Sequence, residues 1–189
     1  MPSPVVIILA AGRGERFLAS GATTHKLDAL LHGQSVLTHV IQAVKNAGLA
    51  WHLVRPEGGS RGMGESIALG VSAAPHAAGW LILPGDLPLI QPDSLRLVAE
   101  GLREKPVVVP HYRQQQGHPV AFSHDFLPQL AALTGDSGAK EIVRSARLHH
   151  QVLDLALQDG GIGHDIDTLA DLALAERALS SHQWRRTMD

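Results

Sequence analysis

The chain opens on the apolar run Val5-Val6-Ile7-Ile8-Leu9, which passes directly into Ala10-Ala11-Gly12-Arg13-Gly14-Glu15-Arg16-Phe17, with Lys26 further along. A short β-branched run bounded by small residues predicts a buried strand of a parallel sheet. The small residues after it let the backbone approach a ligand closely. Backbone N–H groups in such a loop, next to a helix N-terminus, suit phosphate oxygens, and the basic side chains add positive charge. We therefore expect a polyphosphate site here, although a tight strand-to-helix turn without a ligand would show the same local pattern.

The glycine loop differs from the two common phosphate-binding motifs. A P-loop has a Gly-Lys-Ser/Thr string after its first glycine, and this sequence contains none. Gly12 and Gly14 fit the first two positions of the dinucleotide fingerprint G-x-G-x-x-G, but Phe17 stands at the third. The remaining pattern, L-A-A-G-x-x-x-R followed by a lysine, resembles the signature of nucleotidyltransferases.

Composition limits the class of protein. The chain has 189 residues and a net charge of −2 with the two signs mixed, so a nucleic-acid partner is not expected. It lacks an apolar run of about 18 residues and a signal-peptide pattern, so no membrane span is expected. It has no cysteine, and its 12 histidines are scattered without zinc-type spacing. We expect one domain over residues 1–189 of a cytoplasmic enzyme, with a loosely held tail over residues 180–189.

Strand-like and helix-like segments alternate along the chain, which predicts an α/β layer architecture. Apolar patterning and turn residues predict strands at 5–9, 51–54, 79–83, 107–109, 117–122 and 150–155, the fifth of them a candidate antiparallel strand. The same signals predict helices at 35–47, 65–73, 92–104, 126–133, 139–146 and 168–179. Thr168 is placed to cap the last helix, with Asp171 at the capping-box position.

Asp86 follows the predicted strand at 79–83, within Pro84-Gly85-Asp86-Leu87-Pro88. Ligands of open α/β sheets bind at the carboxyl ends of the strands, so Asp86 is expected near the glycine loop. A lone carboxylate would repel phosphates there, whereas a carboxylate that holds Mg²⁺ would bridge to them. Taken alone, Asp86 would also suit a turn or a helix cap.

A second acidic motif, Gly163-His164-Asp165-Ile166-Asp167-Thr168, precedes the last predicted helix. In an extended segment, alternate residues project to the same side, so both carboxylates would face one way. One would complete a metal site with Asp86. The alternative is that Asp165 or Asp167 simply caps the last helix, and both interpretations can hold, one for each residue. We favour Asp167 as the ligand and leave open whether Asp165 contributes.

Six short motifs resemble, in order, those of molybdenum-cofactor nucleotidyltransferases. They are the glycine loop with its lysine, Gly62-Met63-Gly64-Glu65-Ser66, Gly85–Pro88, Gly117-His118-Pro119, Gly135–Lys140 and Asp165–Thr168. The resemblance runs from Val5 to about Leu179. Within that family, the Ala-Ala-Gly, Gly-His-Pro and Gly-Asp-Ser-Gly-Ala-Lys strings are most similar to the cytidylyltransferase branch.

The resemblance implies a three-layer α/β/α, Rossmann-like, mostly parallel sheet of the nucleotide-diphospho-sugar transferase type. It implies transfer of CMP from CTP to the phosphate of molybdopterin, with release of pyrophosphate and with Mg²⁺ as cofactor. Arg16 and Lys26 would be catalytic, and Asp86 and Asp167 would bind the metal. The implied nucleotide-binding residues are Leu9, Ala10, Ala11, Gly12, Arg13, Gly14, Glu15, Gly62, Met63, Gly64 and Ser66, and the implied acceptor-binding residues are His118 and Asp136. A turn histidine and a surface-turn aspartate are the alternatives for those last two.

Two departures from the family pattern keep other functions open. Phe17-Leu18 stands where relatives usually have Met-Gly, and the region between Gly48 and Gly62 has room for one strand instead of two strands and a helix. This shortened middle region would narrow the sheet at one edge. The alternatives are guanylyl transfer to the same cofactor, nucleotidyl transfer to another phosphorylated small molecule, and a non-enzymatic, nucleotide- or cofactor-binding chaperone for a molybdenum enzyme.

Overall fold

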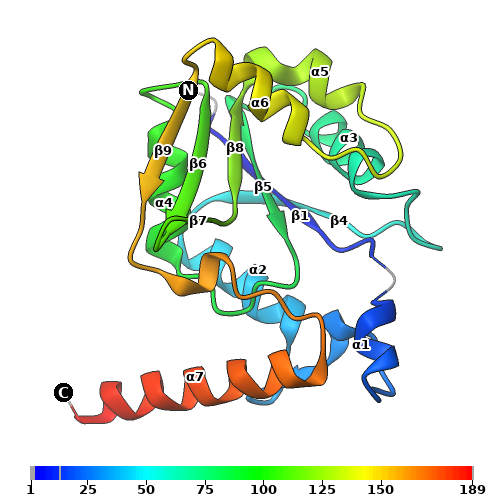
Figure 1. The fold of residues 1–189 in the computed structure, drawn as a ribbon, viewed down its shortest axis with the longest axis vertical. Coiled ribbons are helices and arrows are strands. Elements are labelled where there is room, and N and C mark those ends of the chain that lie inside the picture. Colours follow the sequence, from blue (N-terminus) through cyan, green and yellow to red (C-terminus); the bar gives the residue numbers. More distant parts are fainter. Residues whose placement is uncertain (1–2, 13, 189) are drawn as a thin grey trace.

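A central sheet organises the molecule in the computed structural model, which describes residues 3–12 and 14–188, with side chains up to Ser181. Its strand order is β4-β1-β5-β8-β6-β7, and β9 pairs with β6 in the same sheet (Figure 1). These strands are β1 (Val5–Leu9), β4 (Ala50–Val54), β5 (Gly79–Pro84), β6 (Val107–Tyr112), β7 (Gln115–Gln116), β8 (Val120–Ser123) and β9 (Val152–Ala156). A separate small hairpin pairs β2 (Leu30–Leu31) with β3 (Gln34–Ser35).

Helices and short helical turns connect the strands. The α-helices are α1 (Glu15–Ala19), α2 (Val36–Asn46), α3 (Met63–Ala73), α4 (Pro92–Gly101), α5 (Leu127–Ala131), α6 (Lys140–Leu148) and α7 (Leu169–Met188). The 3₁₀ turns are η1 (Lys26–Asp28), η2 (His124–Phe126) and η3 (Gly160–Ile162). None of the described helices is long and apolar enough to cross a membrane.

Strand direction brings the glycine loop and the Asp86 loop to one edge of the sheet. β1 runs parallel to β4 and β5, with Leu9 opposite Pro84 at the end of the ladder. β6 is parallel to β9, and β8 is antiparallel to both β5 and β6. Because β8 is antiparallel to both β5 and β6, the strands β1, β4, β5, β6 and β9 all run in one direction, so the sheet is mostly parallel. The loops that follow β1 and β5 therefore begin next to each other at the same edge.

Apolar side chains on alternate positions of the strands build a core on each face of the sheet. On β1, Val6 and Ile8 pack in the cluster that contains α2 and α4, whereas Ile7 packs in the cluster that contains α3, α5 and α6. A strand that is buried on both faces needs such a continuous apolar run. The helix–sheet–helix layers confirm the predicted α/β/α fold (Figure 1).

The middle region is short, as predicted. Residues 47–62 contain one strand, β4, which forms an edge of the sheet beside β1. The residues of β4 from Ala50 to His52 are exposed.

Several predicted boundaries move in the structure. β8 begins at Val120 instead of Gly117, after Pro119, which has no N–H to give to a strand ladder. The segment predicted as one helix at 126–133 divides into η2 and α5, and the predicted helix at 92–104 ends at Gly101. The last helix continues beyond the predicted end at Leu179 to Met188.

Candidate functional site

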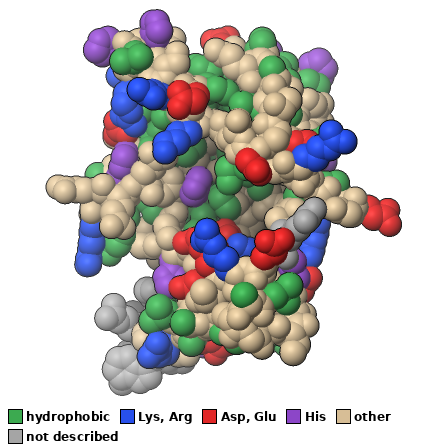
Figure 2. Space-filling view, turned by 45° about the vertical axis from the view of Figure 1, so that its right-hand side comes forward, with side chains coloured by type: hydrophobic (Ala, Val, Ile, Leu, Met, Phe, Trp, Pro, Cys, Tyr) green, Lys and Arg blue, Asp and Glu red, His purple; other side chains and the backbone are tan. Residues whose placement is uncertain are grey.

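A pocket of about 700 Å³ lies at the carboxyl ends of β1 and β5. Of the residues predicted to bind nucleotide, it is lined by Leu9, Ala11, Gly12, Gly14, Glu15, Gly62, Met63 and Ser66. The lining also includes the predicted catalytic, metal and acceptor residues Arg16, Lys26, Asp86, Asp167 and Asp136. In the space-filling view, basic and acidic side chains lie together near the middle of the molecule (Figure 2).

Three of the other predicted residues lie elsewhere. Ala10 is buried under the loop, where its N–H donates to the carbonyl of Val54 at 2.9 Å. Gly64 packs against a neighbouring loop, and His118 is absent from the pocket lining given for the described residues. Arg13 lies outside the residues that the structure describes.

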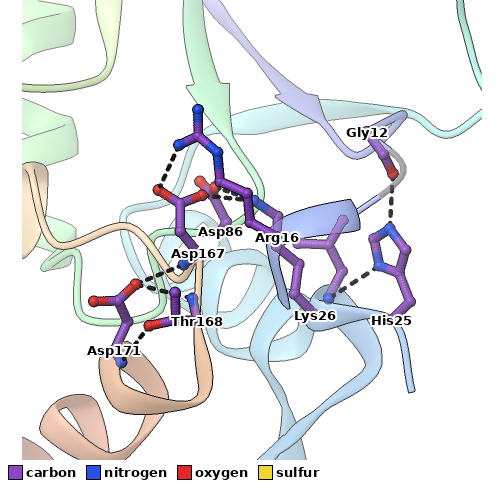
Figure 3. A network of polar contacts seen from close by, with 9 residues as sticks. Gly12, Arg16, His25, Lys26, Asp86, Asp167, Thr168 and Asp171 are labelled. Carbon is purple, nitrogen blue, oxygen red and sulfur yellow. Dashed lines mark hydrogen bonds and ion pairs between the residues drawn. The ribbon is translucent and has the colours of Figure 1, made fainter. Parts of the chain in front are cut away.

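Four charged side chains from distant parts of the sequence meet in the pocket (Figure 3). Lys26 Nζ lies 2.8 Å from Asp86 Oδ2 and 3.4 Å from Asp167 Oδ1. Arg16 approaches the same Asp167 carboxylate at 3.8 Å from the solvent side, with its side chain 83% exposed. The structure thus brings together the two predicted catalytic cations and the two predicted metal ligands.

The lysine is held in its charged form by this arrangement. Burial alone would lower the pKa of Lys26, but the charges and hydrogen bonds of Asp86 and then Asp167 outweigh burial and raise it. Asp86 keeps a second oxygen, Oδ1, that is buried and has no hydrogen-bond partner among the described residues. A buried carboxylate oxygen without a partner is costly, which favours a cationic ligand at this position.

Asp165 is the third carboxylate of the cluster. Single oxygens of Asp86, Asp165 and Asp167 all lie within 4.8 Å of one another. Burial, together with the hydrogen bond and charge of Asp167, raises the pKa of Asp165 to about 6. The hydrogen bond from Asp165, reinforced by the charges of Lys26 and Arg16, lowers the pKa of Asp167 against the effect of burial. The prediction that the two carboxylates face the same way is confirmed.

A capping box holds the second acidic motif in place. The N–H groups of Asp167 and Thr168 each donate to Asp171 Oδ2 at 2.9 Å, and the N–H of Asp171 donates to Thr168 Oγ1 at 3.2 Å. The N–H of Ile166 donates to the backbone oxygen of Asp86 at 2.9 Å, which joins the motif to the β5 loop. Because Thr168 and Asp171 cap α7, the Asp167 carboxylate is left for the pocket.

The loop at 134–138 packs against the start of α3. The N–H of Gly64 donates to the carbonyl of Gly135 at 2.9 Å, and a Cβ at Gly64 would collide with the backbone oxygens of Thr134 and Ser137. A Cβ at Gly62 would collide with the Asp136 carboxylate, so these glycines allow the two loops to meet. Asp136 therefore lies on the part of the pocket that contains Gly62 and Met63.

His118 lies in the neighbouring part of the sheet edge. Its N–H donates to the carbonyl of Ile162 at 2.9 Å, and its Nδ1 is buried without a hydrogen-bond partner in the described part of the chain. Burial lowers the pKa of His118, against the opposing influence of the Asp86 charge.

Six residues of the pocket lining were not predicted from the sequence: Phe17, His25, Leu27, Ser60, Arg61 and Pro84. Two of them, His25 and Ser60, form hydrogen bonds within the pocket wall. His25 Nε2 lies 2.7 Å from the Gly12 carbonyl oxygen (Figure 3). Ser60 Oγ bonds to Ser66 Oγ at 2.6 Å and donates to the Gly62 carbonyl at 3.0 Å, which fixes the glycine-rich loop before α3. The position of His25 directly before Lys26 was a usable signal, whereas Ser60 sits in a loop without a distinguishing pattern.

Comparison with known proteins identifies the family. The model of the MobA-like NTP transferase domain matches residues 6–152, so the chain belongs to this family. PucB, a purine catabolism protein of Bacillus subtilis, is 30% identical over 132 residues, which cover 69% of this chain. The chain spans less than two thirds of the length of the curated relatives that it matches, 63% in the case of PucB.

Solved structures share the fold over nearly the whole chain. Rv0371c from Mycobacterium tuberculosis H37Rv is 26% identical with a TM-score of 0.76, covering 93% of this chain and 98% of that one. Molybdopterin-guanine dinucleotide biosynthesis protein A from Archaeoglobus fulgidus has a TM-score of 0.62 over 94% of this chain and 99% of that one. Because its identity is 15%, this second likeness concerns the fold alone.

Proposed function

We propose that the protein is a nucleotidyltransferase that transfers CMP from CTP to the phosphate of molybdopterin, with release of pyrophosphate. The observation that carries the proposal is the convergence of Arg16, Lys26, Asp86 and Asp167 on one pocket beside the glycine loop. Membership of the MobA-like family supports nucleotidyl transfer. The choice of CTP and molybdopterin rests on the resemblance of the Ala-Ala-Gly, Gly-His-Pro and Gly-Asp-Ser-Gly-Ala-Lys strings.

In the proposed reaction, an acceptor phosphate oxygen attacks the α-phosphorus of CTP, and the bond to the pyrophosphate oxygen breaks. The acceptor is already ionised at neutral pH, so the protein must position the reactants and stabilise negative charge. Lys26 would leave the carboxylates for the α-phosphate, and Arg16 would bind the leaving β- and γ-phosphates, with Arg13 as a further predicted contact. Removal of one such charge is expected to lower kcat by about 10²–10³-fold.

The acidic cluster fits a hard divalent cation. Three carboxylates offer oxygens within 4.8 Å of one another, and Asp86 Oδ1 has no hydrogen-bond partner among the described residues. Asp86 and Asp167 would hold Mg²⁺, which when bound neutralises triphosphate charge. Rv0371c has been crystallised in complex with manganese, which supports the proposal of a divalent ion at this site.

The roles given to the other predicted residues rest on the sequence resemblance. His118 and Asp136 are our candidates for the acceptor site. Our candidates for the nucleotide site are the residues from Leu9 to Glu15 together with Gly62, Met63, Gly64 and Ser66. Delivery of the product to a molybdenum enzyme and a cytoplasmic location stay predictions.

A paired binding and turnover assay tests the proposal. Thermal shift with CTP, GTP, ATP and UTP, each with and without Mg²⁺, reports binding because a ligand of the folded state raises Tm. Pyrophosphate release is then measured with molybdopterin as the acceptor. Asp86→Asn is the test variant, and Asp125→Asn, which changes an exposed carboxylate outside the pocket, is the matched control.

Each result has a distinct meaning. A Mg²⁺-dependent shift with CTP and pyrophosphate release, both lost in Asp86→Asn but kept in Asp125→Asn, supports the proposal. Turnover with GTP alone would keep the chemistry and change the base. Nucleotide binding without release of pyrophosphate from the nucleotide, whichever phosphorylated acceptor is added, would favour the chaperone alternative, and absence of all nucleotide binding would overturn the proposal.

A further inference from the structure

The ring of His25 joins the glycine loop to the segment that carries Lys26. Its Nε2 lies 2.7 Å from the carbonyl oxygen of Gly12, and its Nδ1 accepts a hydrogen bond from the N–H of Leu27 at 3.2 Å (Figure 3). The first bond reaches back over 13 residues to the loop after β1, and the second caps the 3₁₀ turn η1. One ring therefore connects both parts of the pocket wall.

The two partners define the hydrogen positions on the ring. A carbonyl oxygen only accepts and a backbone N–H only donates, so Nε2 carries the hydrogen and Nδ1 offers a lone pair. Gly14 packs against the same ring, because a Cβ there would lie 3.2 Å from its Cδ2 and Nε2 atoms. The ring is thus held by contacts on three sides, all within the pocket lining.

We propose that His25 is a positioning residue that sets the glycine loop for the phosphates of the nucleotide. This inference rests on the proposed function. The Gly12 carbonyl is a negative dipole end next to the space for a polyanion, and a Cβ at Gly12 would meet nothing within 4 Å. By holding this carbonyl, His25 keeps the Gly12 oxygen from turning toward bound phosphate.

The same ring also sets the loop relative to Lys26. Because His25 precedes Lys26 directly and caps η1, the distance between the loop and the start of η1 is fixed before a nucleotide binds. Binding then requires less ordering of the loop, which is the usual gain from preorganisation.

Two substitutions separate the roles of the ring nitrogens. An asparagine side chain reaches about as far as Nδ1, so His25→Asn keeps the cap on Leu27 and loses the bond to Gly12. A glutamine side chain reaches about as far as Nε2, so His25→Gln can keep the bond to Gly12 while losing the cap. His39→Asn is the matched control, because His39 Nε2 also bonds to a backbone carbonyl, that of Leu31, outside this pocket.

The experiment measures Kd for tripolyphosphate and for CTP by calorimetry, together with Tm, on the full chain. We expect His25→Asn to raise the Kd of both ligands by about three- to tenfold, the effect of one lost hydrogen bond, with a Tm close to that of the wild type. We expect His25→Gln to bind closer to wild type despite a lower Tm, and His39→Asn to bind as wild type does. In turnover, KM for the nucleotide should rise more than kcat falls in His25→Asn.

Other outcomes overturn the inference in distinguishable ways. Wild-type affinity in His25→Asn, with the wild type binding both ligands, would show that His25 has no positioning role and would leave the proposed function intact. If the loss of affinity across all three variants were proportional to the decrease in Tm, His25 would have a merely structural role. A wild type that binds neither ligand would overturn the proposed function and this inference together.

Discussion

The ammonium of Lys26 lies 2.8 Å from Oδ2 of Asp86, in direct contact with a carboxylate that we propose as a metal ligand. It also reaches Asp167, the second proposed ligand, at 3.4 Å. The side chains of Lys26 and Asp86 are 16% and 15% exposed, so water screens their contact little. A divalent ion bound by Asp86 and Asp167 would therefore compete with the Lys26 ammonium for the same carboxylates.

Removal of the Lys26 charge is predicted to strengthen metal binding in the absence of nucleotide. Lys26→Met should lower the Kd for Mn²⁺ about fivefold or more, because the ion no longer displaces an ion pair that would contribute about 1 kcal/mol even on an exposed surface. CTP should strengthen Mn²⁺ binding to the wild type, because the triphosphate oxygens would bind the Lys26 ammonium and release the two carboxylates for the metal. Electron paramagnetic resonance of free Mn²⁺ measures both quantities. Lys45→Met, an exposed lysine on α2, serves as the control, and equal Mn²⁺ affinity in both variants would contradict the prediction.

The glycines of the loop after β1 are predicted to respond differently to alanine. A Cβ at Gly12 would meet no atom within 4 Å, so Gly12→Ala should leave Tm nearly unchanged. The same substitution should weaken the binding of CTP, because the added methyl group fills space next to the ligand. Gly14 has a φ of +66°, where a side chain costs about 1–2 kcal/mol, and its Cβ would press on His25. Gly14→Ala should therefore lower both Tm and CTP affinity. Thermal unfolding and calorimetry check the pair, and an unstable Gly12→Ala protein would refute the distinction.

Asp159 is predicted to be a stability residue instead of a functional one. Its side chain is buried and accepts from the Gln91 N–H at 3.0 Å, Ser94 Oγ at 2.8 Å and the Gly161 N–H at 2.8 Å. Asp159→Ala would leave these donors without an acceptor, and we expect a loss of about 2–4 kcal/mol in the free energy of unfolding. Urea unfolding measures this, with Ser94→Ala expected to lose less. A loss below about 1 kcal/mol would contradict the assignment.

His118 is predicted to make stability depend on pH. Its pKa is lowered in the folded state by burial, so below the unfolded value of about 6.5 the unfolded chain binds more protons at this position. Its contribution to stability therefore decreases as the pH falls from about 7 toward 5. The stability of His118→Gln should fall less steeply over this range than that of the wild type. Urea midpoints at several pH values test this, with the exposed His76→Gln as the control, and parallel curves for all three proteins would exclude the effect.

Much of the fold follows from local patterns in the sequence. The apolar run at Val5–Leu9 is found as β1 with the predicted bounds, because a strand buried on both faces needs continuous apolar residues. The Thr168–Asp171 capping box was also predictable, since both partners lie within one helical turn. The strand between α2 and α3 was predicted at 51–54 from its residue pattern, and the short segment between Gly48 and Gly62 left room for one strand only.

Contacts between distant residues were decided by the tertiary structure. Lys26 meets Asp86 over 60 residues and Asp167 over 141, and the ion pairs exist because parallel strands end at one edge of the sheet. The sequence indicated which residue types gather at that edge, but it did not indicate that Lys26 would form ion pairs with the two carboxylates. The tether from His25 to the Gly12 carbonyl was not predicted at all, since every residue has a backbone carbonyl and no pattern distinguishes one that will be bonded. Periodicity and capping are local and can be read along the chain, whereas the geometry of the pocket depends on which loops the packed sheet brings together.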